Sequence, residues 1–294
     1  MTTTAQWTAP GDAGGAAGVA DVVRRMRALA VRLPPSDGVA VFDRVYLSVT
    51  EEFARRLGRG RFPDGPEAAE LAVLFAGRYL AAVEAADAPA PDGPDADGPR
   101  TGAPSTDEPG TDGPDTGAPD TDAPRAGGRV PACWQPLVRA RADPAVHPLQ
   151  FALAGITAHV GHDLALAVVD TCRATGRTPD AVAPDFVAVG AVLTAIEARV
   201  REELMPGPDL LERLDPLTHA VASWSLARAR DGAWAAARLL WAIRDRREAY
   251  EQCARALDVS VGAMARAVLA PFPASAARGL PAQSSGSGTG AISS

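Results

Sequence analysis

The chain has 294 residues, 47% of them hydrophobic, which is enough to bury a sizeable core. Aromatic residues make up only 5%, while alanine and leucine abound and alternating β-branched runs are scarce, so the composition favours helices over sheet. All 29 basic residues are arginine. The lack of lysine excludes lysine Schiff-base chemistry and a phosphate-binding loop, so neither pyridoxal phosphate nor a nucleotide is expected as a cofactor.

The formal net charge of -7 is concentrated in one segment. Residues 87–128 contain ten acidic residues and two arginines, and the rest of the chain, with 26 acidic residues and 27 arginines, is close to neutral. Without a surplus of basic residues, the chain has no electrostatic signature for binding phosphates. We therefore expect neither nucleic acid nor an anionic membrane as a partner.

The N-terminus lacks the basic start and the apolar stretch of a signal peptide. Cys133, Cys172 and Cys253 are odd in number and far apart, and no CxxC pair indicates zinc or a redox dithiol. Both features predict a protein of a reducing compartment, the cytoplasm.

The first part of the chain predicts three helices after a disordered leader over residues 1–18. The first spans Val19–Leu33 and ends at two prolines. The second starts after a Ser-Asp cap and carries one apolar stripe to Leu57. Asp64, followed by an early proline, opens the third, which runs through Val83.

Residues 87–128 contain no hydrophobic side chain larger than alanine or proline. Such a segment cannot bury enough apolar surface to offset its ordering entropy, so we expect it to be disordered. It could separate two domains or interrupt one. The three helices before it span about 68 residues, which would form only a small and marginally stable core on their own. We therefore predict one helical domain formed by residues 19–86 and 129–273.

The second part of the chain predicts five further helices. They are a short helix ending at Ala142, a long one over Pro148–Thr175, one over Asp185–Met205, one from Pro216 that contains Trp224, Trp234 and Trp241 with Gly232 as a candidate break, and one over Val259–Leu269. Residues 274–294 are expected to form a disordered tail. The expected fold is a single all-α, bundle-like domain of about eight helices.

The long apolar helix is a candidate for membrane insertion by length alone. Asp163 near its centre costs ~3 kcal/mol on insertion scales, two histidines add to that cost, and no arginine flanks its start closely. We therefore expect a buried central helix of a soluble bundle and no membrane span.

His159, His162 and Asp163 form a polar cluster on one side of this helix. Ala152 and Gly155 precede them on the same face and leave room for another helix or a ligand. The three side chains can bind one divalent metal, or act without it as a general base and an orienting carboxylate. The alternative is an ordinary His–Asp pair at a helix seam, since a bare HxxHD pattern has low specificity.

Other helices offer polar side chains within apolar stripes. The candidates for binding a substrate beside the cluster are Tyr46, Arg78, Tyr79, Trp224, Arg228 and Asp231. Arg228 and Asp231 are also spaced for a simple salt bridge, and tryptophans more often belong to a core than to a binding site.

The segments DRVYLSVT, LFAGRYL, FALAGITAHVGHDLALAVV and SWSLARAR resemble a mainly actinobacterial, all-helical family known only as a domain of unknown function. The resemblance covers about Val19–Ala86 and Val130–Pro273, and His159, His162 and Asp163 match its central AHxxHDL-type motif. Thr157 and Gly161 depart from that motif, which has a polar amide. The resemblance implies a helical fold and an important cluster but no reaction.

Two classes of function fit these features. The first is an enzyme acting on a small, largely apolar molecule in an interhelical pocket, as a hydrolase or as a cyclase or isomerase of specialised metabolism, with His159, His162 and Asp163 as catalytic residues or metal ligands. The nucleophile-elbow, HExxH, DDxxD and di-iron patterns are absent from the sequence. The second is a non-catalytic helical module that binds a ligand or a protein, whose cluster is a buried structural network. The oligomeric state is left open.

Overall fold

The computed structural model describes residues 15–88, 129–204 and 225–270, apart from the side chains of residues 193–204. Within these ranges every regular element is a helix and none is a strand. One long helix is built from three consecutive segments, and when it is counted once the described residues form eight helices. The expected all-α fold is confirmed.

Three helices precede the insertion, and the second and third begin where the sequence predicts caps. They are α1 (Gly15–Arg32), α2 (Gly38–Leu57) and α3 (Gly65–Asp87). The carboxylate of Asp37 accepts a hydrogen bond from the backbone N–H of Val39 at 2.8 Å, and Asp64 accepts one from Glu67 at 3.1 Å. Only the start of α1 differs, lying four residues before the expected Val19.

The long central helix has the predicted bounds. It consists of α5 (Pro148–Ala158), the π-helical turn η1 (His159–Asp163) and α6 (Leu164–Thr175). His147 and Gln150 form a capping box at its start, and Gly176 ends it with a φ of +67°, a left-handed conformation that glycine adopts without strain. Of its most apolar window, 89% is buried against other helices, as in the core helix of a soluble protein.

The other helices after the insertion are α4 (Gln135–Ala140), α7 (Pro179–Leu204), α10 (Leu226–Ala242) and α11 (Arg247–Val268). Three expected boundaries are wrong. Helix α7 starts at Pro179 rather than Asp185 and accommodates a proline within it, and α10 continues through Gly232. Helix α11 begins twelve residues before Val259, and its first turns combine polar i,i+4 pairs, such as Arg247 with Glu251 at 2.9 Å, with an apolar stripe that includes Tyr250 and Leu257 and packs on the core.

Several expectations concern residues outside the described ranges. These are most of the leader, the insertion, the helix start at Pro216 and the tail. The predicted disorder of the leader, the insertion and the tail stays a prediction, as does the helix start at Pro216. Helix α10 begins at Leu226 after its N-cap Ser225, so the expectation of one helix through Trp224 and Trp234 is wrong.

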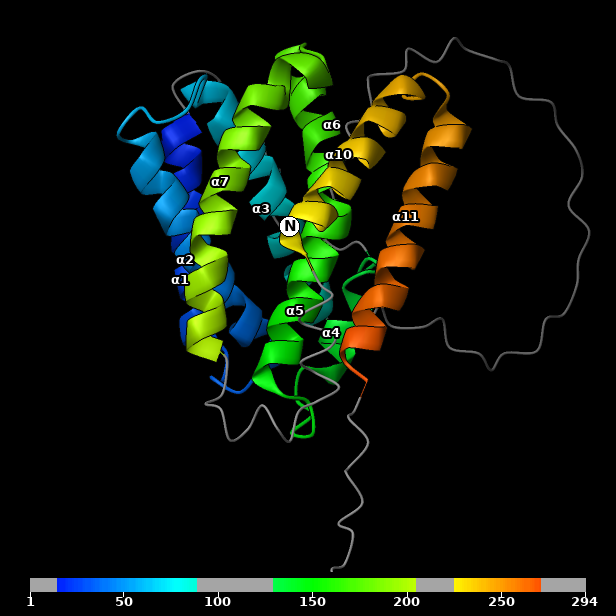
Figure 1. The fold of residues 1–294 in the computed structure, drawn as a ribbon. Coiled ribbons are helices and arrows are strands. Elements are labelled where there is room, and N and C mark those ends of the chain that lie inside the picture. Colours follow the sequence, from blue (N-terminus) through cyan, green and yellow to red (C-terminus); the bar gives the residue numbers. More distant parts are fainter. Residues whose placement is uncertain (1–14, 89–128, 205–224, 271–294) are drawn as a thin grey trace, which may run out of the picture.

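The central helix lies in the middle of the molecule, and helices from both sides of the insertion pack on it (Figure 1). Helix α2 packs on α5 and α3 packs on α6, while α11 covers α5, and α10 covers α6 and η1. Helix α1 packs on α2 and α3. The two parts of the sequence therefore form one helical body that the insertion interrupts.

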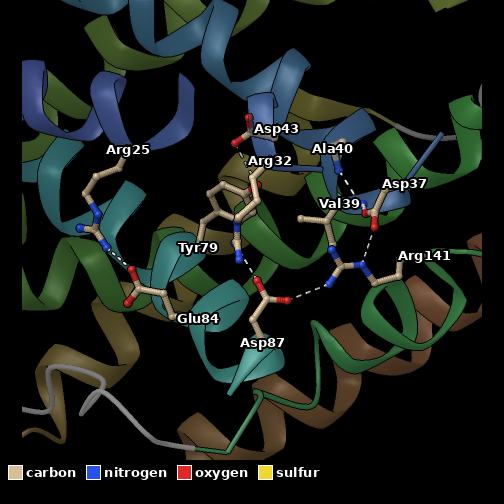
Figure 2. A network of polar contacts seen from close by, with 10 residues as sticks. All are labelled: Arg25, Arg32, Asp37, Val39, Ala40, Asp43, Tyr79, Glu84, Asp87 and Arg141. Atoms are coloured by element: carbon tan, nitrogen blue, oxygen red, sulfur yellow. Dashed lines mark hydrogen bonds and ion pairs between the residues drawn. The ribbon is translucent and has the colours of Figure 1, made fainter. Parts of the chain in front are cut away.

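Figure 2 shows a polar network that joins the two sides of the insertion. Arg141, just after α4, donates to Asp37 at 2.7 Å and to Asp87 at 3.2 Å, and Asp87 also accepts from Arg32 at 2.7 Å. Asp87 is the last residue of α3. The point where the chain leaves the helical body is thus tied to α1, to the start of α2 and to the segment that follows α4.

Candidate functional site

The backbone of η1 widens the central helix at the polar cluster. The N–H of Leu164 donates to the carbonyl of His159, five residues back, instead of the four of an α-helix. In this wider turn the side chains of His159 and His162 both lie within hydrogen-bond distance of the carboxylate of Asp163. Such π-helical turns are rare in proteins, and those that occur are often found at functional sites.

The carboxylate of Asp163 is the centre of the cluster. Its Oδ2 accepts from the indole Nε1 of Trp134 at 2.9 Å and lies 3.0 Å from Nδ1 of His159, while its Oδ1 lies 2.8 Å from Nδ1 of His162. Burial on its own would raise the pKa of Asp163, but the hydrogen bonds from the two histidines prevail and hold it well below its usual range. Because an ionised carboxylate can only accept, both imidazoles carry their proton on Nδ1.

The imidazole of His159 lies in a box of aromatic rings. It stacks on Phe75 with a centroid distance of 3.6 Å and an angle of 6°. Its other ring neighbours, at centroid distances from 4.4 to 6.1 Å, are Tyr46, Phe42, Trp134 and Tyr79. Nε2 of His159 is buried and has no hydrogen-bond partner in the part of the chain that the structure describes.

The charge state of His159 follows from this environment. Burial lowers its pKa, and the opposing hydrogen bond and charge of Asp163 do not cancel the effect. The imidazole is therefore neutral at pH 7, with the lone pair on Nε2 directed away from Asp163.

His162 faces a second group of side chains. Its Nε2 lies 3.9 Å from Oδ1 of Asp258 on α11, and potential ligand atoms of Cys133, His162 and Asp258 all lie within 4.8 Å of one another. Asp258 also accepts from the backbone N–H groups of Ala132 at 2.9 Å and Cys133 at 2.8 Å. Burial, followed by the charges of Asp163 and Asp258, raises the pKa of the Cys133 thiol well above its ordinary value.

The structure brings the three predicted metal ligands, His159, His162 and Asp163, together. They contact one another through hydrogen bonds and do not point their ligand atoms at a common metal position. Nδ1 of His159 and Nδ1 of His162 both contact the carboxylate of Asp163, and their Nε2 atoms face different surroundings. In this arrangement the three residues form a hydrogen-bonded network. The atoms that converge as a possible metal site are those of Cys133, His162 and Asp258.

Two of the predicted substrate-binding residues lie beside His159 and a third lies near the cluster. The rings of Tyr46 and Tyr79 belong to the aromatic box, and the hydroxyl of Tyr79 donates to Oδ1 of Asp43 at 3.0 Å (Figure 2). Arg78 is paired with Asp170 on α6.

The other three predicted substrate-binding residues are placed differently. Arg228 and Asp231 are exposed on α10, in contrast to the buried cluster, and Trp224 lies outside the described residues. The ring of Trp234 lies 4.6 Å from that of Phe186, centroid to centroid and tilted by 37°, and so packs with α7.

The space beside the small residues of α5 is occupied by another helix. A Cβ atom at Gly155 would lie 2.9 Å from Cβ of Phe42 and closer still to its ring. Glycine at this position therefore permits the close contact between α5 and α2, the first of the two expected uses of that face.

Sequence reasoning did not single out Trp134, Phe75 or Asp258 as parts of the site. No spacing rule connects Cys133 with His162 and Asp258, because the three come from separate segments. The local signal is weak: Cys133 and Trp134 stand in a short polar-apolar stretch between two prolines, where a turn is expected.

The sequence matches a protein family described as a family of unknown function, DUF5995, over residues 19–96 and 117–271. The chain belongs to this family. The membership confirms the resemblance to a helical domain of unknown function. DUF5995 carries no assigned activity, and no curated protein and no solved structure matches the chain. The chemistry of this DUF5995 member must therefore be argued from its own side chains.

Proposed function

We propose that the protein is an enzyme that acts on a small, largely apolar molecule, with His159 as general base and Asp163 as its orienting carboxylate. The observation that carries the proposal is the buried Nε2 of His159, which lacks a partner among the described residues while Nδ1 is held by Asp163. A carboxylate on Nδ1–H fixes the tautomer whose Nε2 can accept a proton. A general base needs this combination.

The surroundings of the imidazole support the proposed class of substrate. Five aromatic rings lie around His159, and such rings favour a flat, apolar molecule over a charged one. The base would activate water in a hydrolase, or remove a proton from carbon in an isomerase or cyclase of specialised metabolism. We place this activity in the cytoplasm, with a small molecule rather than a nucleic acid as the partner.

A non-catalytic module is the second candidate, and the dense packing of the cluster favours it. Asp163 accepts from three N–H donors, and the ring of Phe42 fills the space above Gly155. In that case the network holds α5 and α6 in place, and the buried Nε2 of His159, which has no partner among the described residues, lowers the stability of the fold. Access of a small molecule to His159 separates the two candidates.

NMR of the ¹⁵N-labelled full-length protein tests this access. Long-range imidazole correlations, assigned with His159→Gln, should show an unprotonated Nε2 on His159 whose signals shift when phenol or indole is added. The His147 signals provide the internal control and should not move, because that imidazole caps α5. If neither probe reaches His159, the structural network is the better account.

Turnover tests the catalytic role. The assays are hydrolysis of p-nitrophenyl esters from acetate to octanoate and solvent-deuterium exchange into cyclic ketones. We expect His159→Gln to lower any activity by about 10²–10⁴-fold, the usual contribution of a general base. The matched control is His147→Asn, which retains a side-chain cap and should keep wild-type turnover. Turnover that survives in His159→Gln contradicts the proposal.

A further inference from the structure

Three segments far apart in the sequence place one potential ligand atom each at the same point. Cys133 lies in the turn before α4, His162 in η1 and Asp258 on α11, and their ligand atoms lie within 4.8 Å of one another. Cys133 and His162 are buried, while the side chain of Asp258 is 22% exposed. The group is therefore enclosed on most sides and reaches solvent on the side of α11.

Two glycines allow the three segments to approach closely. A Cβ atom on Gly262 would lie 2.5 Å from the carbonyl oxygen of Ala132, so glycine lets α11 lie directly against the turn that carries Cys133. A Cβ on Gly161 would lie 3.2 Å from the side chain of Val261, which brings η1 against the same part of α11. The convergence of the three ligand atoms thus depends on the backbone packing.

The side chains are also oriented for binding a cation. Asp163 accepts from Nδ1 of His162, which leaves the lone pair of His162 on Nε2, the atom that faces Asp258. A histidine that binds a metal commonly donates its other ring N–H to a carboxylate, which fixes the tautomer and makes the nitrogen a better ligand. Asp258 is held in place by the backbone N–H groups of Ala132 and Cys133.

We propose that Cys133, His162 and Asp258 bind one divalent transition metal of the Zn²⁺ type, with Asp163 as the outer carboxylate that orients His162. Sulfur, imidazole nitrogen and carboxylate oxygen are the ligands of tetrahedral zinc. Bonds of 2.0–2.3 Å in that geometry put ligand atoms about 3.3–3.7 Å apart, so side-chain shifts of about an ångström close the site. Three protein ligands leave the fourth position for water or a substrate, the arrangement of a catalytic zinc site.

This site is separate from the proposed role of His159, although both use Asp163. A metal bound by His162 would place a Lewis acid on the other side of the carboxylate that orients His159. Metal binding does not require that His159 act as a base, and the two proposals can fail independently.

The test is titration of the full-length protein, stripped of metal with EDTA, with Co²⁺. We expect one equivalent to produce a near-ultraviolet thiolate-to-cobalt band and the intense visible bands of tetrahedral Co²⁺. Added Zn²⁺ should abolish these bands and raise the melting temperature, because a ligand that binds only the folded state stabilises it. Failure of the wild-type protein to develop a thiolate band overturns the proposal.

Variants assign the ligands. Cys133→Ser, a near-isosteric change, should abolish the thiolate band while circular dichroism shows unchanged helix content. The matched control is Cys253→Ser, on the same α11 as Asp258 but only half-buried, which should keep the band. A band that persists in Cys133→Ser, or disappears in Cys253→Ser, places the metal elsewhere and contradicts the assignment.

Two further variants separate this inference from the proposed function. Asp163→Asn should weaken Co²⁺ binding by about 10–100-fold, the usual effect of losing an outer-shell carboxylate. His159→Gln should leave Co²⁺ binding unchanged even if it abolishes turnover. Unchanged Co²⁺ affinity in a folded Asp163→Asn protein contradicts the orienting role of Asp163.

Discussion

At the level of single residues, Asp43 on α2 is fully buried and only one of its carboxylate oxygens is hydrogen-bonded. Its Oδ1 accepts from Tyr79, while Oδ2 has no partner in the part of the chain that the structure describes. Burial raises the pKa of Asp43 from 3.8 to about 7, and the hydrogen bond from Tyr79 and the charge of Arg44 only partly oppose it. The carboxyl group is therefore largely protonated in mildly acidic solution and becomes charged near neutrality.

This raised pKa predicts a specific pH dependence of stability. The unfolded chain releases the proton near pH 3.8 and the folded protein near pH 7, so the contribution of Asp43 to folding is complete below pH 3.8 and is lost as the pH rises to 7. In Asp43→Asn this loss is absent, and above pH 7 the variant should be more stable than wild type by at most about 4 kcal/mol. Urea unfolding of both proteins from pH 4 to pH 8 measures the difference, and a difference that does not change with pH contradicts the prediction.

Trp134 offers a second test at this scale, because it donates to a buried, ionised carboxylate. Trp134→Phe removes the indole N–H and should cost about 2–4 kcal/mol of unfolding free energy, the loss of a charged hydrogen bond together with that of buried ring area. Trp241→Phe is the matched control: Trp241 is only half-buried and lies beneath the guanidinium of Arg244, so its replacement should cost about 1 kcal/mol or less. Equal losses in the two variants would show that the hydrogen bond to Asp163 contributes little.

At the level of the elements, the contact between α2 and α5 depends on the missing side chain of Gly155. Gly155→Ala would force a Cβ atom into Phe42 and should destabilise the protein by about 1–3 kcal/mol. Gly77→Ala is the control: this glycine lies within α3 with nothing within 4 Å of the added atom, and the change should stabilise the protein by about 0.4–1 kcal/mol. We expect the denaturant midpoint to fall below that of wild type in Gly155→Ala and to rise above it in Gly77→Ala. An unchanged midpoint in Gly155→Ala contradicts the packing argument.

The helix boundaries show where local sequence signals predict the start of a helix and where they do not. The starts of α2, α3 and α5 coincide with Asp37, Asp64 and the proline after His147, because a cap is a local interaction. The starts of α11 and α7 differ from the expected ones: α11 begins at Arg247, without a side-chain cap, and α7 begins at Pro179 and continues through Pro184. Tertiary packing of the neighbouring helices outweighs these local preferences.

At the level of the whole molecule, the insertion should be dispensable for folding. Residues 97–116 lie between the two segments that match DUF5995, and the helices on either side of the insertion already pack on one central helix. We expect deletion of residues 97–116 to leave a single unfolding transition and to change the melting temperature by only a few degrees, since shortening a long loop changes its closure entropy by less than about 1 kcal/mol. Calorimetry that shows two transitions, or a large loss of stability, contradicts one interrupted domain.

The helical class, the caps and the central apolar helix with its polar cluster could be predicted from the sequence, because composition, capping and hydrophobic period act over a few residues. The sequence also placed His159, His162 and Asp163 near one another, since they lie within one turn. The groups that these three residues contact are known only from the folded protein: Trp134 contacts Asp163, Phe75 stacks on His159, and Cys133 and Asp258 lie near His162. These neighbours come from distant segments, and their approach depends on packing at glycines and on a π-helical turn that no local pattern specifies.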